Sequence, residues 1–236
     1  MKILAVDTSG PYAGAAVMED GVITHEIAAC HGLTHSQTSL PMIEQALSAA
    51  SLTPADIDLF AAVTGPGSFT GVRIGVCEAK GLAHACGKKI VGVDALEALA
   101  MNAFGFSGLI CPMLDARRSQ VYCAAFRFAG GELPERVLPD EALPLADFLA
   151  RLPKNETCLF LGDGLKAHFP AVSLALGGRA TAAPASMAYL RAASACAIAE
   201  KRAGEAVEPM ALEPLYLRAP QAERERNARL NQAGGE

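Results

Sequence analysis

The sequence lacks tryptophan, clustered basic residues and long uninterrupted apolar segments. Its 236 residues include 25 Asp and Glu against 20 Lys and Arg, a net charge of −5. Proteins that grip a nucleic-acid backbone by themselves usually display clustered Lys and Arg, so we expect any RNA to be held by a partner. The alanine-rich stretch at 180–199 is interrupted by Pro184 and Arg191, which argues against a membrane span.

Signals for export and for disulfides are also missing. Only a short apolar run separates Lys2 from Asp7, too short for the apolar core of a secretion signal. The seven cysteines are odd in number and form no Cys-x-x-Cys pair. Such cysteines are typical of small buried hydrophobes in a reducing compartment. We therefore expect a cytoplasmic protein without membrane contact, structural disulfide or zinc–thiolate site.

The hydrophobic share of 51% suffices for one large domain or two smaller ones. Apolar periodicity and turn residues predict, in chain order, strands at 2–8, 13–19 and 22–28, a helix at 36–50, a short helix beginning at 54, a strand at 58–64, a helix at 70–86, a strand at 90–93 and a helix at 94–103. A second stretch begins in the same order, with strands at 109–115, 120–128 and 133–138, a helix at 144–152, a strand at 158–162 and a helix at 186–203.

The repeated order of elements predicts an α/β protein of two duplicated lobes. In both halves the first strand ends in an aspartate, Asp7 and Asp115. We expect an amino-terminal lobe over 1–104, completed by a segment near 205–218, and a smaller lobe over 105–204. The charged tail over 219–236 is predicted to be mobile.

A glycine-rich turn, Gly65-Pro66-Gly67-Ser68-Phe69-Thr70-Gly71, joins a predicted strand to a helix. The free N–H groups and the dipole of a helix N-terminus favour anions, so the turn fits a phosphate cradle. It equally fits a tight turn whose small residues let strand and helix pack closely. It matches neither of the two standard nucleotide-binding glycine motifs.

The helix that follows carries a stripe of small residues at Gly71, Gly75, Ala79 and Ala83. Such a stripe lets another helix approach closely, and most often that helix is a neighbour in the same chain. Gly75 and Gly81 each cost about 1 kcal/mol against alanine inside a helix, so their presence predicts a packing reason. Because the helix is apolar nearly all round, we expect a partner protein to cover part of it.

Several motifs form a recognisable set. They are Ile3-Leu4-Ala5-Val6-Asp7-Thr8-Ser9, His35-Ser36 with Leu40-Pro41-x-Ile43, Gly65 to Gly75, Ala79-Lys80-Gly81-Leu82-Ala83, Asp115-Ala116-Arg117-Arg118 with Val121-Tyr122, and Glu213 to Arg218. Together they resemble the TsaB (YeaZ) family, with a resemblance that runs from residue 2 to about 218. The resemblance implies an actin-like (ASKHA, ribonuclease H-like) two-lobed fold with mixed sheets flanked by helices.

The resemblance also implies a function. TsaB is the non-catalytic, dimerising subunit of the bacterial machinery that forms N6-threonylcarbamoyladenosine at position 37 of tRNAs. It works with the catalytic paralogue TsaD and the ATPase TsaE, forms a homodimer when alone, and meets tRNA only through the complex. In the family the first two long helices pair with those of TsaD or of a second copy. Here the expected interface residues are Leu40, Ile43, Leu47, Gly71, Val72, Ile74, Gly75, Ala79 and Leu82.

Catalysis by this chain is not expected. The paralogue's metal-binding pattern, His-x-Glu-x-His, places its two histidines on Ala95 and Leu99, and neither side chain can ligate a metal. His31 and His35 stand four residues apart, as a metal pair on a helix would. The nearby sequence offers no third ligand, so helix capping or packing is the alternative.

An ATP-dependent small-molecule kinase with the same fold is the second hypothesis, and a serine hydrolase built on Ser68 is the third. We expect no resident cofactor, but ATP or ADP fits a site between the lobes or one shared with TsaD. The residues expected near its phosphates and metal are Asp7, Thr8, Ser9, Gly67, Ser68, Thr70 and Asp115. For Asp7 the alternative is capping of neighbouring backbone donors.

Overall fold

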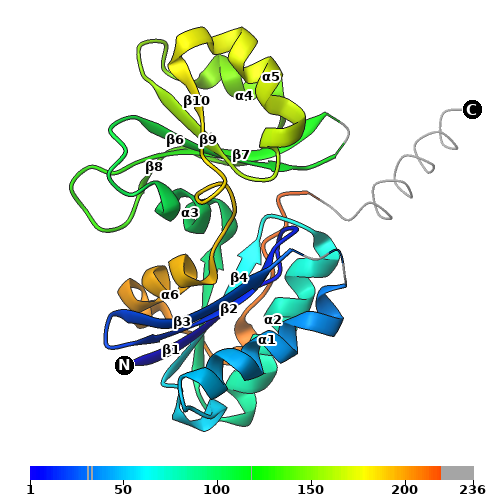
Figure 1. Ribbon diagram of the computed structural model, residues 1–236, viewed down its shortest axis with the longest axis vertical. Coiled ribbons are helices and arrows are strands. Elements are labelled where there is room, and N and C mark those ends of the chain that lie inside the picture. Colours follow the sequence, from blue (N-terminus) through cyan, green and yellow to red (C-terminus); the bar gives the residue numbers. More distant parts are fainter. Residues whose placement is uncertain (31, 33, 118, 219–236) are drawn as a thin grey trace, which may run out of the picture.

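The computed structural model describes residues 1–30, 32, 34–117 and 119–218. Within them the chain forms two lobes, each built on a five-stranded mixed sheet with helices on its faces (Figure 1). The predicted α/β class and mixed sheets are therefore confirmed. The predicted tail over 219–236 and the predicted role of His31 lie outside the described residues.

The first sheet has the strand order β3-β2-β1-β4-β5. Its strands are β1 (Lys2–Asp7), β2 (Ala13–Glu19), β3 (Val22–Ala29), β4 (Leu59–Gly65) and β5 (Lys89–Asp94). Strand β1 pairs antiparallel with β2 and parallel with β4, so that Ala5 faces Ala16 on one side and Ala61 on the other. This central strand is apolar on both faces because helices cover both.

Alternate residues of β1 point to different helical layers. Leu4 and Val6 pack with α1 (His35–Ala49) and α2 (Phe69–Ala85) on one face of the sheet. Ile3 and Ala5 pack with α3 (Ala95–Ala100) and α6 (Ala192–Lys201) on the other face (Figure 1).

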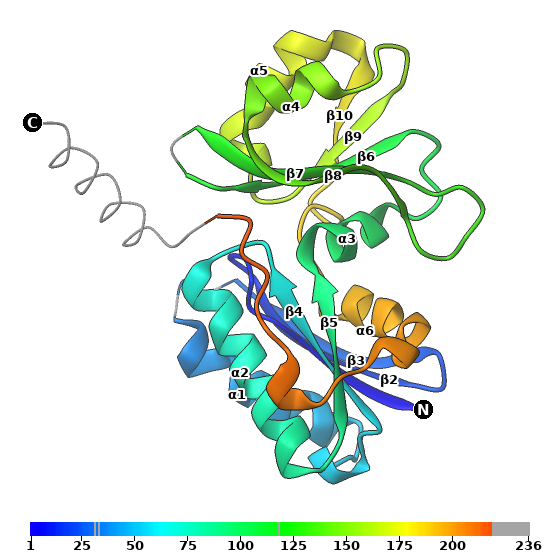
Figure 2. The ribbon, with the colours of Figure 1, turned by 180° about the vertical axis from the view of Figure 1, so that it is seen from behind.

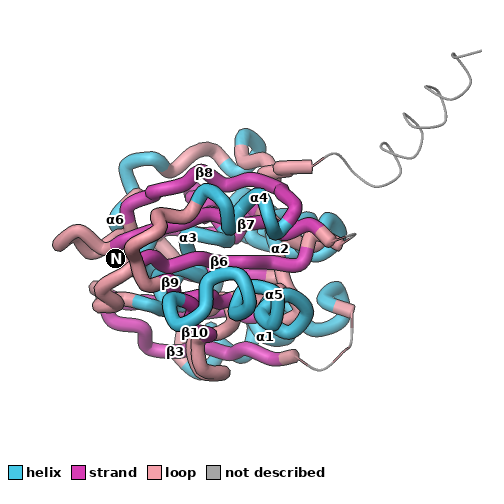
Figure 3. The backbone as a smooth tube through the Cα atoms, turned by 90° about the horizontal axis from the view of Figure 1, so that it is seen from above, coloured by secondary structure: helices cyan, strands magenta, loops and turns pink. Residues whose placement is uncertain are grey.

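The second sheet repeats this topology in the order β8-β7-β6-β9-β10. Its strands are β6 (Leu109–Asp115), β7 (Gln120–Arg127), β8 (Glu135–Pro144), β9 (Cys158–Leu161) and β10 (Ala180–Ala182). In Figure 3, α4 (Leu145–Arg151) and α5 (Leu165–Leu176) cover its outer face. Short α3 lies between the two sheets, so its apolar residues join both lobes in one continuous core (Figure 2).

Four elements differ from the sequence-based expectation. Strand β8 ends at Pro144 instead of near 138. Helix α6 begins at Ala192 instead of near 186, and Arg191 just before it is extended and pairs with Glu26 of β3. The same helix packs on the first sheet, not on the second lobe to which its position in the chain assigned it. Helix α5 and strand β10 were not expected. Helix α5 packs Leu165, Phe169, Val172 and Leu176 on the core of the second lobe, but its exposed side carries apolar residues as well, so no clear amphipathic pattern marks it in the sequence.

After α6 the chain stays on the first lobe. Val207 exchanges two backbone hydrogen bonds with Ile90 of β5, of 3.0 and 2.9 Å. Leu212 is buried in the core beneath α2, and the N–H of Leu215 donates to the carbonyl of Thr64 at 2.8 Å. Short 3₁₀ turns complete the described chain at Pro54–Asp56, Met101–Ala103, Gly177–Arg179, Ala203–Glu205 and Pro209–Ala211. Across the described range no helix has the length and apolarity to cross a bilayer.

Candidate functional site

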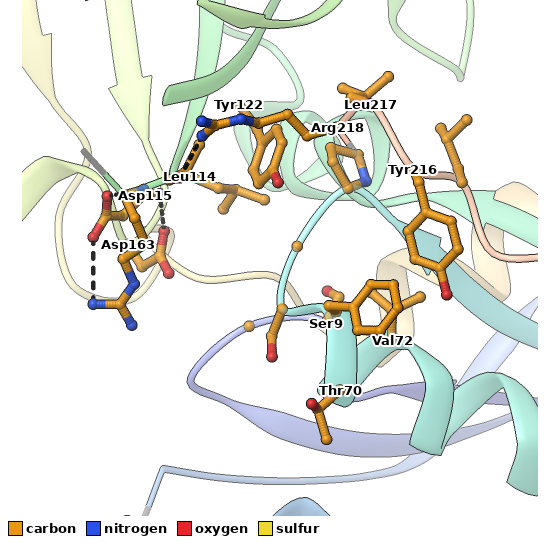
Figure 4. Close-up of a pocket in the computed structure, with 18 of the residues that line it drawn as sticks. Ser9, Thr70, Val72, Leu114, Asp115, Tyr122, Asp163, Tyr216, Leu217 and Arg218 are labelled. Atoms are coloured by element: carbon orange, nitrogen blue, oxygen red, sulfur yellow. Dashed lines mark hydrogen bonds and ion pairs between the residues drawn. The ribbon is translucent and has the colours of Figure 1, made fainter. Parts of the chain in front are cut away.

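A cleft of about 500 Å³ opens between the lobes (Figure 4). Ser9 and Thr70 border it from the first lobe, and Asp115, Tyr122 and Asp163 border it from the second. Of the residues predicted near a nucleotide, those that line the cleft are Ser9, Gly67, Ser68, Thr70 and Asp115. The other two, Asp7 and Thr8, do not line it, because both are almost wholly buried behind it.

Asp7 and Asp115 have equivalent places and equivalent hydrogen bonds. The Oδ1 of Asp7 accepts from the N–H of Ser9 at 2.8 Å, and the Oδ1 of Asp115 accepts from the N–H of Arg117 at 2.8 Å. Each aspartate thus caps the loop that follows the first strand of its lobe. Burial raises the pKa of Asp7, although hydrogen bonds from Ser9 oppose the shift.

The glycine-rich turn is packed against the loop after β1. The N–H of Ser68 donates to the carbonyl of Ser9 at 2.7 Å, and the Ser68 hydroxyl accepts from the N–H of Gly71 at 3.2 Å. A Cβ on Gly67 would lie 2.3 Å from the oxygen of Ser9. Close packing therefore explains the small residues, and two of the amides that a phosphate could use are already bonded.

The stripe of small residues on α2 faces inward, which corrects its expected use by a partner. A Cβ on Gly71 would lie 2.1 Å from the backbone oxygen of Thr8, and one on Gly75 would lie 2.5 Å from its Oγ1. Ala79 and Ala83 are fully buried in the same core. The stripe thus serves contact within the chain.

The predicted interface residues separate into two groups. Those buried within the chain are Ile43, Leu47, Gly71, Val72, Gly75 and Ala79. They cannot form a free surface without unfolding. Leu40 is 44% exposed, and Ile74 and Leu82 are half-buried, so these three remain available at the surface.

Helix α2 has a second, outward stripe that the sequence reading missed. Its members are Thr70, Ile74, Cys77, Gly81 and Ala85. They recur at i, i+4, i+7, i+11 and i+15, the spacing of one helical face. None is charged, and a Cβ on Gly81 would touch nothing within 4 Å. We call this stripe, together with exposed Leu40 and Pro41 of α1, the docking face.

The carboxy-terminal segment binds the start of α2. The Arg73 guanidinium lies 3.9 Å from the ring centre of Phe69, and its Nε donates to the Tyr216 hydroxyl at 2.8 Å. Lys80 donates to the carbonyl of Leu212 at 2.7 Å. Arg218 then crosses to the second lobe, where it donates to the carbonyl of Ala116 at 3.0 Å. The segment therefore ties α2 to the rim of the cleft.

The place where the resemblance puts the paralogue's metal site is filled by core packing. Ala95 and Leu99 are both 0% exposed. Asp94 caps α3 by accepting from the N–H of Glu97 at 2.8 Å, and Glu97 pairs with Arg202 at 2.6 Å. In the part of the chain that the structure describes, no group of three potential metal ligands is present.

Comparisons with known proteins agree with this architecture. A family model described as TsaD, tRNA N6-adenosine threonylcarbamoyltransferase, matches residues 23–226. The tRNA threonylcarbamoyladenosine biosynthesis protein TsaB of Bacillus subtilis is 36% identical over 94% of this chain and 96% of its own length. The chain belongs to the TsaB (YeaZ) family.

TsaB proteins of other species and solved structures extend the match. TsaB of Escherichia coli is 35% identical over 60% of this chain and 64% of its own length. The structure of YeaZ from Pseudomonas aeruginosa superposes with a TM-score of 0.76 at 26% identity, covering 92% of this chain and 99% of that one. Component A of an Acidaminococcus fermentans dehydratase shares only the fold, with a TM-score of 0.50 at 11% identity over 86% and 99% of the two chains.

These matches confirm the family and the actin-like two-lobed fold. As a TsaB-family protein, the chain belongs to tRNA threonylcarbamoyladenosine biosynthesis. The residues predicted to lie near a nucleotide stay a prediction. His35 donates from Nε2 to the carbonyl of Gly10 at 2.8 Å if that nitrogen carries its proton, which is the packing role considered above.

Proposed function

We propose that this chain is the non-catalytic, partner-binding subunit of the machinery that forms N6-threonylcarbamoyladenosine in tRNA. The observation that carries the proposal is the replacement of the paralogue's two metal-binding histidines by Ala95 and Leu99, both fully buried. A buried methyl and isobutyl group leave neither a ligand nor room for an ion. The chain then contributes by binding, not by chemistry at this place.

The docking face is the proposed contact with a TsaD-type catalytic subunit. It is uncharged along α2, and Gly81 lets a facing backbone approach closely. Burial of exposed Leu40 with half-buried Ile74 would add apolar contact. When the chain is alone, the same face pairs two copies. A TsaE-type ATPase completes the complex, which holds the tRNA.

Variants of exposed glycines give a matched test. Gly81→Glu should weaken binding to the cognate TsaD-type subunit at least about tenfold, because an unpaired carboxylate would be buried. Gly178→Glu is the control, since a Cβ at that exposed site in the second lobe also touches nothing within 4 Å. Binding is measured by calorimetry, and modified adenosine is measured in tRNA from the reconstituted complex. Equal binding by the two variants would contradict the docking face.

The inter-lobe cleft favours one alternative, a small-molecule kinase that uses ATP. Ser9, Thr70 and Asp115 line the cleft, as a nucleotide site of this fold would require. The pure chain is therefore assayed for ATP turnover with and without the TsaD-type subunit. If the chain alone consumes ATP in a substrate-dependent way and does not associate with the TsaD-type subunit, the kinase hypothesis replaces the proposal.

A further inference from the structure

A polar contact joins α1 and α2 at the edge of the docking face. Glu78 follows Ile74 by four residues and precedes Gly81 by three, so its side chain borders that face. Its Oε1 lies 2.7 Å from the hydroxyl of Ser39 on α1. Ser39 is 2% exposed, and it sits beside exposed Leu40. A partner on the docking face would therefore remove the remaining water from Glu78.

When Glu78 is ionised, the Ser39 hydroxyl has only one proton for its two short contacts. The Ser39 hydroxyl lies 2.7 Å from Glu78 Oε1 and 2.7 Å from the carbonyl oxygen of His35. A hydroxyl has one proton to donate, while a carboxylate and a carbonyl only accept. If Glu78 is protonated, its O–H donates to Ser39, and the Ser39 proton goes to the carbonyl of His35. Both short contacts are then hydrogen bonds.

The other groups around Glu78 do not supply the missing proton in the described structure. Its Oε2 is buried without a hydrogen-bond partner there, and so is Nδ1 of His35. The Nε2 of His35 contacts the carbonyl oxygen of Gly10. The carboxyl group of Asp7, at the end of β1, faces the His35 ring. Burial raises the pKa of Glu78, opposed by the Ser39 hydrogen bond and by His35.

We propose that Glu78 is a proton switch for partner binding: association at the docking face takes up a proton on its carboxyl and therefore tightens as the pH falls. This inference rests on the proposed function. Burial by a partner raises the pKa of a carboxyl further, so the group is ionised in the free chain and neutral in the complex over the pH range between the two pKa values. Across that range the dissociation constant increases by up to about tenfold for each unit by which the pH rises.

The substitution Glu78→Gln imitates the neutral state, because its amide donates to the Ser39 hydroxyl as the protonated acid would. We expect the wild-type affinity for the TsaD-type subunit, measured from about pH 8 downward, to increase as the pH falls through the range between the two pKa values of Glu78. Glu78→Gln should bind at about pH 8 with the affinity that the wild type reaches only at lower pH. Asp147→Asn changes an exposed carboxylate of α4, in the second lobe away from the docking face, and is the control, which should keep the wild-type pH dependence.

Calorimetry in two buffers of different ionisation enthalpy counts the protons taken up. Uptake by the wild type and by Asp147→Asn but not by Glu78→Gln supports the switch. Equal pH dependence in Glu78→Gln and wild type, or pH-independent association of the wild type, overturns the switch and leaves the proposed function intact. Absence of association at every pH overturns the proposed function, and the switch with it.

Discussion

Thr8 inserts its side chain between two turns of α2, where its Oγ1 accepts a hydrogen bond from the N–H of Gly75 at 2.9 Å. The same oxygen donates to the carbonyl of Gly71 at 2.6 Å. In an uninterrupted helix that carbonyl and that N–H would bond to each other. The end of β1 and the helix are therefore joined by a contact that only a residue without a side chain permits.

Gly75→Ala should destabilise the protein by about 1–3 kcal/mol, because the added Cβ would lie 2.5 Å from Oγ1 of Thr8. In the Thr8→Ala background the loss should be smaller, since that oxygen is gone and the two sites are coupled. Gly81→Ala, at an exposed helical position, should instead stabilise by up to about 1 kcal/mol. Denaturant unfolding is measured for the wild type, for Gly75→Ala and Thr8→Ala alone and together, and for Gly81→Ala. Equal costs of Gly75→Ala with and without Thr8 would refute the contact.

Cys77 should become protected from alkylation when a TsaD-type subunit is added. It is exposed on the docking face, whereas exposed Cys30 lies outside that face. Mass spectrometry after a brief pulse of maleimide reports both thiols in one sample, so Cys30 serves as an internal control. Protection of Cys30 with continued labelling of Cys77 would place the partner elsewhere.

Arg202→Met should destabilise the protein by about 3 kcal/mol near neutral pH, because the Glu97 side chain, only 3% exposed, would lose its counter-charge. Burial already raises the pKa of Glu97, and Arg202 opposes that shift. Without the arginine the pKa rises further, so the folded state binds the proton more readily than the unfolded state. The deficit should therefore be largest above the raised pKa and shrink as pH falls through it.

The test of this pair is denaturant unfolding at several pH values. The double variant Glu97→Gln with Arg202→Met keeps the shape and removes the titrating group. Its stability deficit should not change with pH in the range where that of Arg202→Met does. A deficit of Arg202→Met that is constant with pH would show that Glu97 does not titrate there.

Replacing Ala95 and Leu99 by histidine should not create a metal site. Both positions are fully enclosed in the core that joins the lobes, so the two rings would be overpacked and the protein strongly destabilised. Metal analysis of the purified protein and thermal melting with added zinc check this expectation. A folded double variant with one tightly bound ion per chain would show that the site was lost through its ligands alone.

Local sequence was sufficient for most of the fold. Buried strands such as β6 (Leu109–Asp115) are continuous apolar runs closed by turn residues, so their limits are visible along the chain. Helix α2 was displaced by one residue at each end, because its start depends on the Ser68 cap. Helix α5 was missed because its exposed side, which includes Leu174 at 89% exposure, is apolar as well.

The sequence by itself determined the family, the α/β class and the absence of metal-ligating side chains at Ala95 and Leu99, since these depend on which residues occur and in what order. Only the tertiary structure decided which stripe of α2 is exposed at the surface and which is buried within the chain. The stripes through Gly75 and Gly81 are both uncharged and rich in small residues, so composition does not distinguish them. The approach of Thr8, 67 residues earlier in the chain, buries the first and leaves the second outside.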